Sequence, residues 1–223
     1  MSIRVTLKDG ATLEFAPGIT VQEVAAHISK KLEKEALVGE VDGEVRDLSF
    51  PITSDAQVRI LTFADAAGRD AFRHTSSHIL AQAVMRLFPE AKLGIGPAIA
   101  DGFYYDFDVP RPFTPEALEQ IEAEMARIVE ADYPIQSFSL PREVAIAFME
   151  ERAQPYKVEL IKELPDDAVI TFYKQGEFVD LCAGPHLSST GKVKAFKLLQ
   201  AAGAYWRGSE KNKMLQRIYG TSF

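Results

Sequence analysis

The chain has 223 residues, of which 47% are hydrophobic and 26% charged, proportions typical of a soluble globular protein with one large domain or two small ones. No apolar run approaches the length of a membrane span, the first residues alternate like a strand, and a single cysteine cannot form an internal disulfide. We therefore expect a cytoplasmic protein with no signal peptide and no membrane partner, and the net charge of −7 disfavours broad attraction to nucleic acid.

The first sixty or so residues predict a small domain of their own. Alternating apolar residues on either side of a turn at 8–10 predict a hairpin, and a second hairpin is expected around Asp42-Gly43. Residues 20–23 form a capping box ahead of a helix whose apolar positions recur at helical spacing from Val21 to Leu32. A strand at 57–61 completes the unit. One amphipathic helix among several short strands predicts a ubiquitin-like β-grasp domain over residues 1–62.

The remaining residues, 63–223, predict a larger α+β domain. A polar stretch at 64–70 is expected to link the two domains. Helices and strands follow in mixed order, which indicates a largely antiparallel sheet. The expected helices cover 70–88, 142–152 and 157–163, with another beginning at the capping residue Thr114, and the expected strands cover 102–108, 135–140, 170–173, 177–181, 194–199 and 216–219.

The single cysteine and three of the four histidines form two pairs with the same spacing. His74 and His78 are four residues apart, as are Cys182 and His186. Residues at this spacing lie on one face of a helix. In the predicted helix the apolar stripe lies nearly opposite the two histidines, so we expect these to face either solvent or a second layer that forms a site. Gly184-Pro185 favours a loop for the second pair.

Four interpretations of this cluster are open. Three imidazoles and a thiol match in number and type the ligands of a tetrahedral zinc ion. Without a metal, an imidazole would activate water, Asp180 would orient the substrate or a histidine, and Lys157 is a possible cation for a developing oxyanion. A Cys–His nucleophile is a third interpretation, for which the chain carries no cysteine-hydrolase signature. An inert Cys182 remains a fourth.

One segment near the C-terminal end is basic although the chain is acidic. It carries seven basic residues against one acidic residue. It is either a solvated surface or a stripe that binds phosphates, because recognition of a nucleic-acid backbone depends on local charge. Tyr205 and Trp206 lie within it and either stack a base or belong to the core. The basic residues are Lys192, Lys194, Lys197, Arg207, Lys211, Lys213 and Arg217.

Several motifs together carry a family resemblance. They are Arg73-His-Thr-Ser-Ser-His78, Gly96-Pro97, Gly102-Phe-Tyr-Tyr-Asp106, Tyr156-Lys157, Val179-Asp-Leu-Cys-Ala-Gly-Pro-His186, Phe196-Lys197, Gly203-Ala-Tyr-Trp-Arg-Gly208 and Met214-Leu-Gln-Arg-Ile-Tyr-Gly-Thr221. Over essentially its whole length the chain resembles the N-terminal half of bacterial threonyl-tRNA synthetases. The first unit is similar to their TGS domain, and the second resembles their editing domain, which hydrolyses serine wrongly attached to threonine tRNA. The two spaced pairs also occur in alanyl-tRNA synthetase editing domains, where zinc is expected.

The resemblance implies roles for individual residues. His74 and Lys157 would activate water, and Tyr105 would help to wall the pocket. The seryl group and the terminal adenosine of the tRNA would be bound or oriented by His78, Asp180, Cys182 and His186. Lys192, Lys194, Lys197, Arg207, Lys211 and Lys213 would contact tRNA. No cofactor is expected in this region, with zinc on His74, His78, Cys182 and His186 as the alternative.

The resemblance also implies that this chain is part of a longer enzyme. Aminoacylation with ATP, magnesium and zinc, and homodimerisation, would belong to domains outside the chain, and the region alone would be a monomer. Three other hypotheses stay open at this point. They are a zinc-containing tRNA-binding module without catalysis, a zinc-dependent editing hydrolase of the alanyl type, and a regulatory TGS-type module whose partner is unknown.

Overall fold

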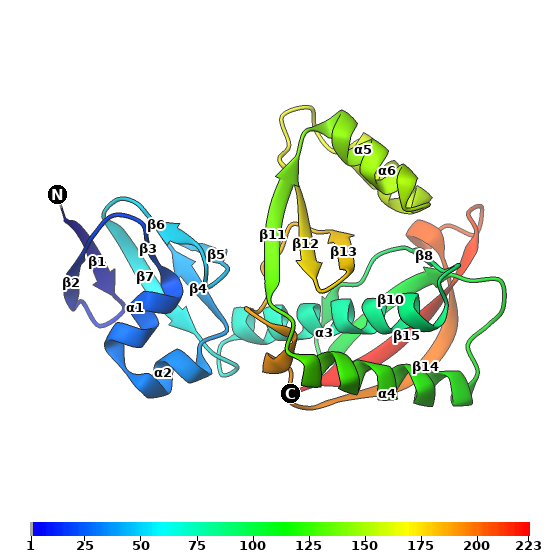
Figure 1. The fold of residues 1–223 in the computed structure, drawn as a ribbon, viewed down its shortest axis with the longest axis horizontal. Coiled ribbons are helices and arrows are strands. Elements are labelled where there is room, and N and C mark those ends of the chain that lie inside the picture. Colours follow the sequence, from blue (N-terminus) through cyan, green and yellow to red (C-terminus); the bar gives the residue numbers. More distant parts are fainter. Residues whose placement is uncertain (1) are drawn as a thin grey trace. The chain divides into compact units, whose positions relative to one another are not determined.

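The computed structural model describes residues 2–223, which form two compact units (Figure 1). The first unit runs to Phe72 and includes the short segment Gly184–Ser188, and the second contains Arg73–Ala183 and Ser189–Phe223. None of the helices in the described part of the chain has the length and apolar character that crossing a lipid bilayer requires. The domain boundary expected between residues 62 and 63 stays a prediction.

The first unit is the predicted β-grasp domain. Its five-stranded sheet has the order β2-β1-β7-β4-β5, in which β1 is antiparallel to β2 and parallel to β7. Val5, Val24 and Val58 are among the residues that fill its core. The elements are β1 (Ile3–Leu7), β2 (Thr12–Phe15), β3 (Ile19–Thr20), α1 (Val21–Ile28), α2 (Lys30–Glu35), β4 (Val38–Val41), β5 (Glu44–Arg46), β6 (Pro51–Ile52) and β7 (Ala56–Leu61).

The helix of the β-grasp unit begins where the capping box predicts but is interrupted. The backbone N–H of Glu23 donates to the Thr20 hydroxyl at 3.2 Å, and that of Thr20 donates to the Glu23 carboxylate at 2.8 Å. The expected continuation to Leu32 is wrong as a single helix. Ser29 is extended and its Oγ accepts from the backbone N–H of Leu32, so it ends α1 and caps α2.

The second unit is α+β with antiparallel strand pairing, as predicted, but it contains two sheets. One has the order β14-β15-β10-β8, with β9 added on β10, and the other is β11-β12-β13. The strands are β8 (Lys92–Leu93), β9 (Ala98–Ile99), β10 (Gly102–Asp108), β11 (Ile135–Leu140), β12 (Ile170–Gln175), β13 (Phe178–Leu181), β14 (Phe196–Tyr205) and β15 (Met214–Ser222). The helices are α3 (Ala66–Leu87), α4 (Pro115–Ala131), α5 (Arg142–Glu151) and α6 (Pro155–Glu163), with 3-10 turns η1 (Thr190–Lys192) and η2 (Trp206–Gly208).

Helix α3 differs from its prediction at its start and in its burial. It begins at Ala66, so most of the polar stretch expected to link the domains is its first turn and a half. Every side chain over residues 75–84 is buried, which makes the centre of α3 a core helix rather than a surface helix with one apolar stripe. Buried polar side chains there find partners: Ser76 donates to Ser222 at 2.8 Å and Ser77 to the carbonyl of Gly96 at 2.6 Å.

Candidate active site

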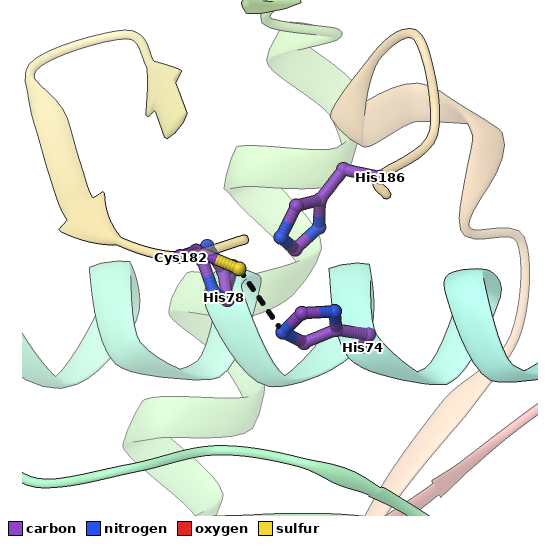
Figure 2. A group of neighbouring side chains, drawn as sticks. All are labelled: His74, His78, Cys182 and His186. Carbon is purple, nitrogen blue, oxygen red and sulfur yellow. Dashed lines mark hydrogen bonds between the residues drawn. The ribbon is translucent and has the colours of Figure 1, made fainter. Parts of the chain in front are cut away.

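The two spaced pairs predicted from the sequence meet in the structure. The metal-ligating atoms of His74, His78, Cys182 and His186 all lie within 4.8 Å of one another (Figure 2). Helix α3 presents the first two from one face, and Cys182 follows the last residue of β13. The Cys182 sulfur is 3.4 Å from Nε2 of His74, and the rings of the α3 histidines meet edge to face at 5.1 Å. As predicted, the second pair lies in a loop.

A buried ion pair adjoins the histidines. Nζ of Lys157, on α6, is 2.8 Å from Oδ1 of Asp180, on β13. The Tyr105 hydroxyl, from β10, donates to the other carboxylate oxygen at 2.5 Å, and Nε2 of His78 is 3.7 Å from that oxygen. All four side chains are buried. Three sequence-predicted residues therefore converge on His78 from three different elements, and a buried, specifically paired charge in this position is characteristic of functional sites.

Burial and neighbouring charges fix the protonation of two groups in this cluster. Desolvation holds the pKa of His78 well below its usual value, and electrostatic interactions with His74 and Lys157 lower it further. His78 is therefore neutral at pH 7. Burial raises the pKa of Tyr105 well above its usual value, and the adjacent Asp180 carboxylate raises it further. Tyr105 thus keeps its proton and serves as a hydrogen-bond donor.

The donor set fits zinc in kind. Zinc lies about 2.0–2.3 Å from nitrogen and sulfur ligands, which places neighbouring ligands of a tetrahedron roughly 3.3–3.8 Å apart. The 3.4 Å contact between Cys182 and His74 falls in that range. The Lys157 ammonium acts against a metal, because it is close enough to His78 to disfavour a second positive charge there. The residues can therefore hold zinc, but with a cation beside the site.

The basic segment is largely balanced by acidic side chains from elsewhere in the chain. Lys197 pairs with Glu122 at 2.6 Å, Lys213 with Asp108 at 2.8 Å, Arg207 with Glu163 at 2.6 Å and Arg217 with Asp106 at 2.7 Å. Trp206 is buried and donates its indole N–H to Glu159 at 3.2 Å, so it belongs to the core, whereas Tyr205 is 39% exposed. Four of the seven basic residues are thus paired with acidic side chains, and the contact of the segment with tRNA stays a prediction.

A polar group that sequence reasoning missed lies further along α3. Gln82 and Arg86 continue the four-residue spacing of His74 and His78, and they contact Gln175 and Glu177 at the turn between β12 and β13. The repeated spacing was the available signal. Their partners are some ninety residues away in the sequence, so no local motif marks them.

The comparisons with known proteins agree with this architecture. Residues 3–62 match the TGS domain family, and residues 170–219 match the family described as the threonyl and alanyl tRNA synthetase second additional domain. The second match includes β12, β13 and the loop carrying Cys182 and His186. The fold and the matches define the class: a β-grasp TGS domain joined to a second additional domain of the synthetase type.

Longer relatives show which kind of synthetase this chain resembles. The chain is 66% identical over 221 residues to threonine–tRNA ligase of Acetivibrio thermocellus, 60% to that of Clostridium tetani and 58% to that of Desulforamulus reducens. Each match covers 99% of this chain and 35% of the relative, so the chain spans about a third of the length of these relatives. It belongs to the bacterial threonine–tRNA ligase family, as the region that carries the TGS and editing domains.

Proposed function

We propose that this region hydrolyses serine from wrongly charged threonine tRNA, as the editing part of a threonine–tRNA ligase. The observation that carries the proposal is one cluster in the second unit, in which His74 contacts Cys182 and the ring of His78, and His78 in turn lies 3.7 Å from the Asp180 carboxylate of the buried Lys157–Asp180 pair. His74 is a half-buried imidazole, and the ring of His78 lies between it and a buried cation and carboxylate. These are the kinds of group that general-base hydrolysis of an ester requires. The aminoacylation of the longer relatives, with its ATP, magnesium, zinc and homodimer, is proposed for the parent enzyme alone.

The energetics of amino-acid selection explain why such an activity is needed. Serine lacks one methyl group of threonine, and one methyl group is worth only about 1–3 kcal/mol in a binding pocket. A threonine-activating site therefore also accepts serine at a rate that translation does not tolerate. A second site that admits serine and excludes the methyl group of threonine removes the wrong product.

The proposed reaction assigns each residue a step. His74 accepts a proton from water as the water oxygen attacks the ester carbonyl carbon, and the Lys157 ammonium stabilises the negative charge that develops on the carbonyl oxygen. When the bond from carbon to the ribose oxygen breaks, the His74 imidazolium returns its proton to that oxygen. The products are serine and a tRNA with an intact 3′ hydroxyl group.

Asp180 is the proposed anchor for the seryl amine or hydroxyl group. Its Oδ1 is buried and, apart from the ion pair with Lys157, accepts no hydrogen bond within the described residues. Each carboxylate oxygen accepts two hydrogen bonds, so this oxygen retains capacity for a substrate donor. Tyr105 fixes the other oxygen, and His78, Cys182 and His186 would surround the seryl group and the terminal adenosine.

The proposed partner is threonine tRNA, whose 3′ end carries the ester. The basic segment would meet its acceptor end through Lys192, Lys194, Lys197, Arg207, Lys211 and Lys213. Of these, Lys194 and Lys211 are exposed and form no ion pair within residues 2–223, so they are the most accessible for a phosphate.

Zinc on His74, His78, Cys182 and His186 is the second candidate, favoured by their ligand atoms lying within 4.8 Å of one another. A bound zinc ion would supply an activated water in a hydrolase, or hold the loop in a module that only binds tRNA. We propose the metal-free site because of the adjacent Lys157.

The deciding experiment incubates the 223-residue chain with Ser-tRNA(Thr), with and without chelator, alongside elemental analysis. Metal-independent deacylation is expected. Stoichiometric zinc, lost together with activity, would establish the alternative, and no deacylation at all would refute the proposed function.

A further inference from the structure

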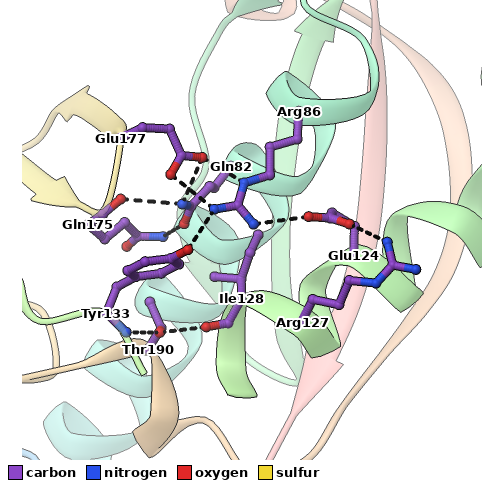
Figure 3. Close-up of polar contacts among 9 residues, drawn as sticks. All are labelled: Gln82, Arg86, Glu124, Arg127, Ile128, Tyr133, Gln175, Glu177 and Thr190. Atoms are coloured by element: carbon purple, nitrogen blue, oxygen red, sulfur yellow. Dashed lines mark hydrogen bonds and ion pairs between the residues drawn. The ribbon is translucent and has the colours of Figure 1, made fainter. Parts of the chain in front are cut away.

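A second polar cluster joins α3 to the turn between β12 and β13, about one to three helical turns beyond the histidines (Figure 3). The guanidinium group of Arg86 grips the Glu177 carboxylate with two hydrogen bonds, Nε to Oε1 at 2.6 Å and Nη2 to Oε2 at 3.0 Å. The same group donates to Glu124 of α4 at 3.0 Å and to the Tyr133 hydroxyl at 3.1 Å. One side chain therefore connects α3 to the β12–β13 turn, to α4 and to Tyr133, two residues before β11.

A buried amide pair lies directly beside this ion pair. Nε2 of Gln175 donates to Oε1 of Gln82 at 2.9 Å, and Nε2 of Gln82 donates to the Gln175 carbonyl at 3.3 Å and to Glu177 at 3.2 Å. The two glutamines are 0% and 1% exposed. If the β12–β13 hairpin moved relative to α3, the amide groups of the two glutamines would lose their hydrogen-bond partners. Because the groups are buried, water would not replace those partners, and the move would cost free energy.

The contacts along the helix and the hairpin occur in matching order. His74, His78, Gln82 and Arg86 are spaced every four residues, so they form one stripe along α3. His74 contacts Cys182, the ring of His78 meets that of Phe178 edge to face at 6.0 Å, and Gln82 and Arg86 contact the residues of the turn. The Arg86–Glu177 ion pair and the Gln82–Gln175 amide pair are called the clamp below. The candidate site and the clamp are thus two ends of one interface between α3 and the β12–β13 hairpin.

The geometry of the clamp determines the register of that interface. Moving a strand by one residue shifts it by about 3.3 Å, and an error of about 1 Å in a catalytic site already reduces the rate. A bidentate guanidinium–carboxylate pair tolerates little displacement, because both hydrogen bonds must keep their direction. The Gln82–Gln175 amide pair and the bidentate Arg86–Glu177 pair together therefore fix how the α3 histidines align with Asp180 and Cys182.

The Arg86–Glu177 ion pair lies where it can align the hairpin with α3 but contributes little to the free energy of unfolding. The Glu177 side chain is 57% exposed, and both Arg86 and Glu177 line a cavity of about 360 Å³. Ion pairs this accessible to water contribute little to the free energy of unfolding. The Arg86 guanidinium also holds the pKa of Glu177 at about 2, so the pair stays charged throughout the working pH range.

We propose that Arg86 and Glu177, supported by the Gln82–Gln175 amide pair, are positioning residues that set the register of the α3 histidines against Asp180 and Cys182. This inference rests on the proposed hydrolytic function for its effect on rate. It goes beyond that function because it assigns a catalytic contribution to residues that touch no substrate.

The test compares single-turnover and steady-state deacylation of Ser-tRNA(Thr) by Glu177→Gln, Arg86→Lys and a matched control. Glu177→Gln removes the charge, and Arg86→Lys keeps the charge but cannot form the fork. The control is Glu40→Gln, which removes the charge from another Arg–Glu ion pair, in the β-grasp unit, where Nη1 of Arg59 contacts the two Glu40 oxygens at 3.2 and 3.3 Å. We expect each clamp variant to lower kcat about tenfold or more, with KM changed less than about threefold and Tm close to that of the control. A kcat for Glu177→Gln equal to that of the control would overturn the proposal.

Alkylation of Cys182 by iodoacetamide provides a readout that does not need hydrolysis. Cys182 is the single cysteine of the chain, and its sulfur contacts His74, so the pH profile of its alkylation reports that contact. We expect Glu177→Gln to change the profile and Glu40→Gln to leave it unchanged. An unchanged profile in Glu177→Gln would overturn the proposal. If the unmodified chain deacylates nothing, the proposed function fails, and the clamp is then judged by the alkylation profile alone.

Discussion

Replacing the buried Lys157–Asp180 pair separates what this site contributes to catalysis from what it contributes to folding. The two side chains are 3% and 2% exposed and their charged atoms lie 2.8 Å apart. Lys157→Met leaves the Asp180 carboxylate buried with the Tyr105 hydroxyl as its remaining strong partner. Breaking a buried pair from one side costs about 3–5 kcal/mol, so the single variant should lose that much free energy of unfolding.

An apolar replacement of the whole group should behave differently. In the triple variant Lys157→Met, Asp180→Leu, Tyr105→Phe no charge or hydroxyl is left unpaired, and such replacements are commonly neutral or stabilising by about 1–4 kcal/mol. We therefore expect the triple variant to be at least as stable as the unmodified chain, yet without deacylation activity. Urea denaturation followed by circular dichroism gives both free energies. A triple variant as unstable as Lys157→Met would show that the pair is needed for folding, and a cost below about 1 kcal/mol for Lys157→Met would contradict the burial on which the calculation rests.

Three further predictions follow from the same structure. His74→Ala should lower the hydrolytic rate about 10²–10⁴-fold in single-turnover assays, and near-normal turnover would remove His74 from the role of base. Lys211→Ala combined with Lys213→Ala should weaken tRNA binding and flatten its dependence on salt concentration, whereas an unchanged salt slope would leave this segment a solvated surface. Because the folded-state pKa of Glu177 is about 2 and its usual value is 4.5, its ion pair with Arg86 should contribute stability that is complete above pH 4.5 and lost as the pH falls towards 2. Its exposure limits the effect to about 1 kcal/mol or less, and Glu177→Gln should remove that part of the acid dependence in urea titrations.

Local sequence rules predicted much of the fold because its signals lie within a few residues. The capping box at Thr20 and the cap at Thr114 predict the starts of α1 and α4, since each cap bonds a backbone N–H three residues away. The interruption at Ser29 was not predicted, because apolar spacing continues through a break in the backbone. The burial of Trp206 also depends on tertiary contacts that spacing does not encode.

The candidate site was predictable in composition but not in arrangement. The four-residue spacing of His74 and His78 marks them as neighbours on α3, and the same argument applied to Gln82 and Arg86 would have extended the stripe. The ion pair between Lys157 and Asp180 was not predicted, because a contact between α6 and β13 leaves no periodic trace in the sequence. Residues that act across a tertiary interface are therefore the ones that the sequence alone does not reveal.

The relative rates of Ser-tRNA(Thr) and Thr-tRNA(Thr) deacylation test the central claim most directly. The two esters have nearly equal intrinsic reactivity, so any preference must come from the pocket. Overpacking one methyl group costs about 1–3 kcal/mol, and displacement of the attacking water adds to that loss. We expect the serine ester to be hydrolysed at least about 100-fold faster, near the upper limit that one methyl group supplies. Comparable hydrolysis of the two esters by the unmodified chain would contradict an editing function.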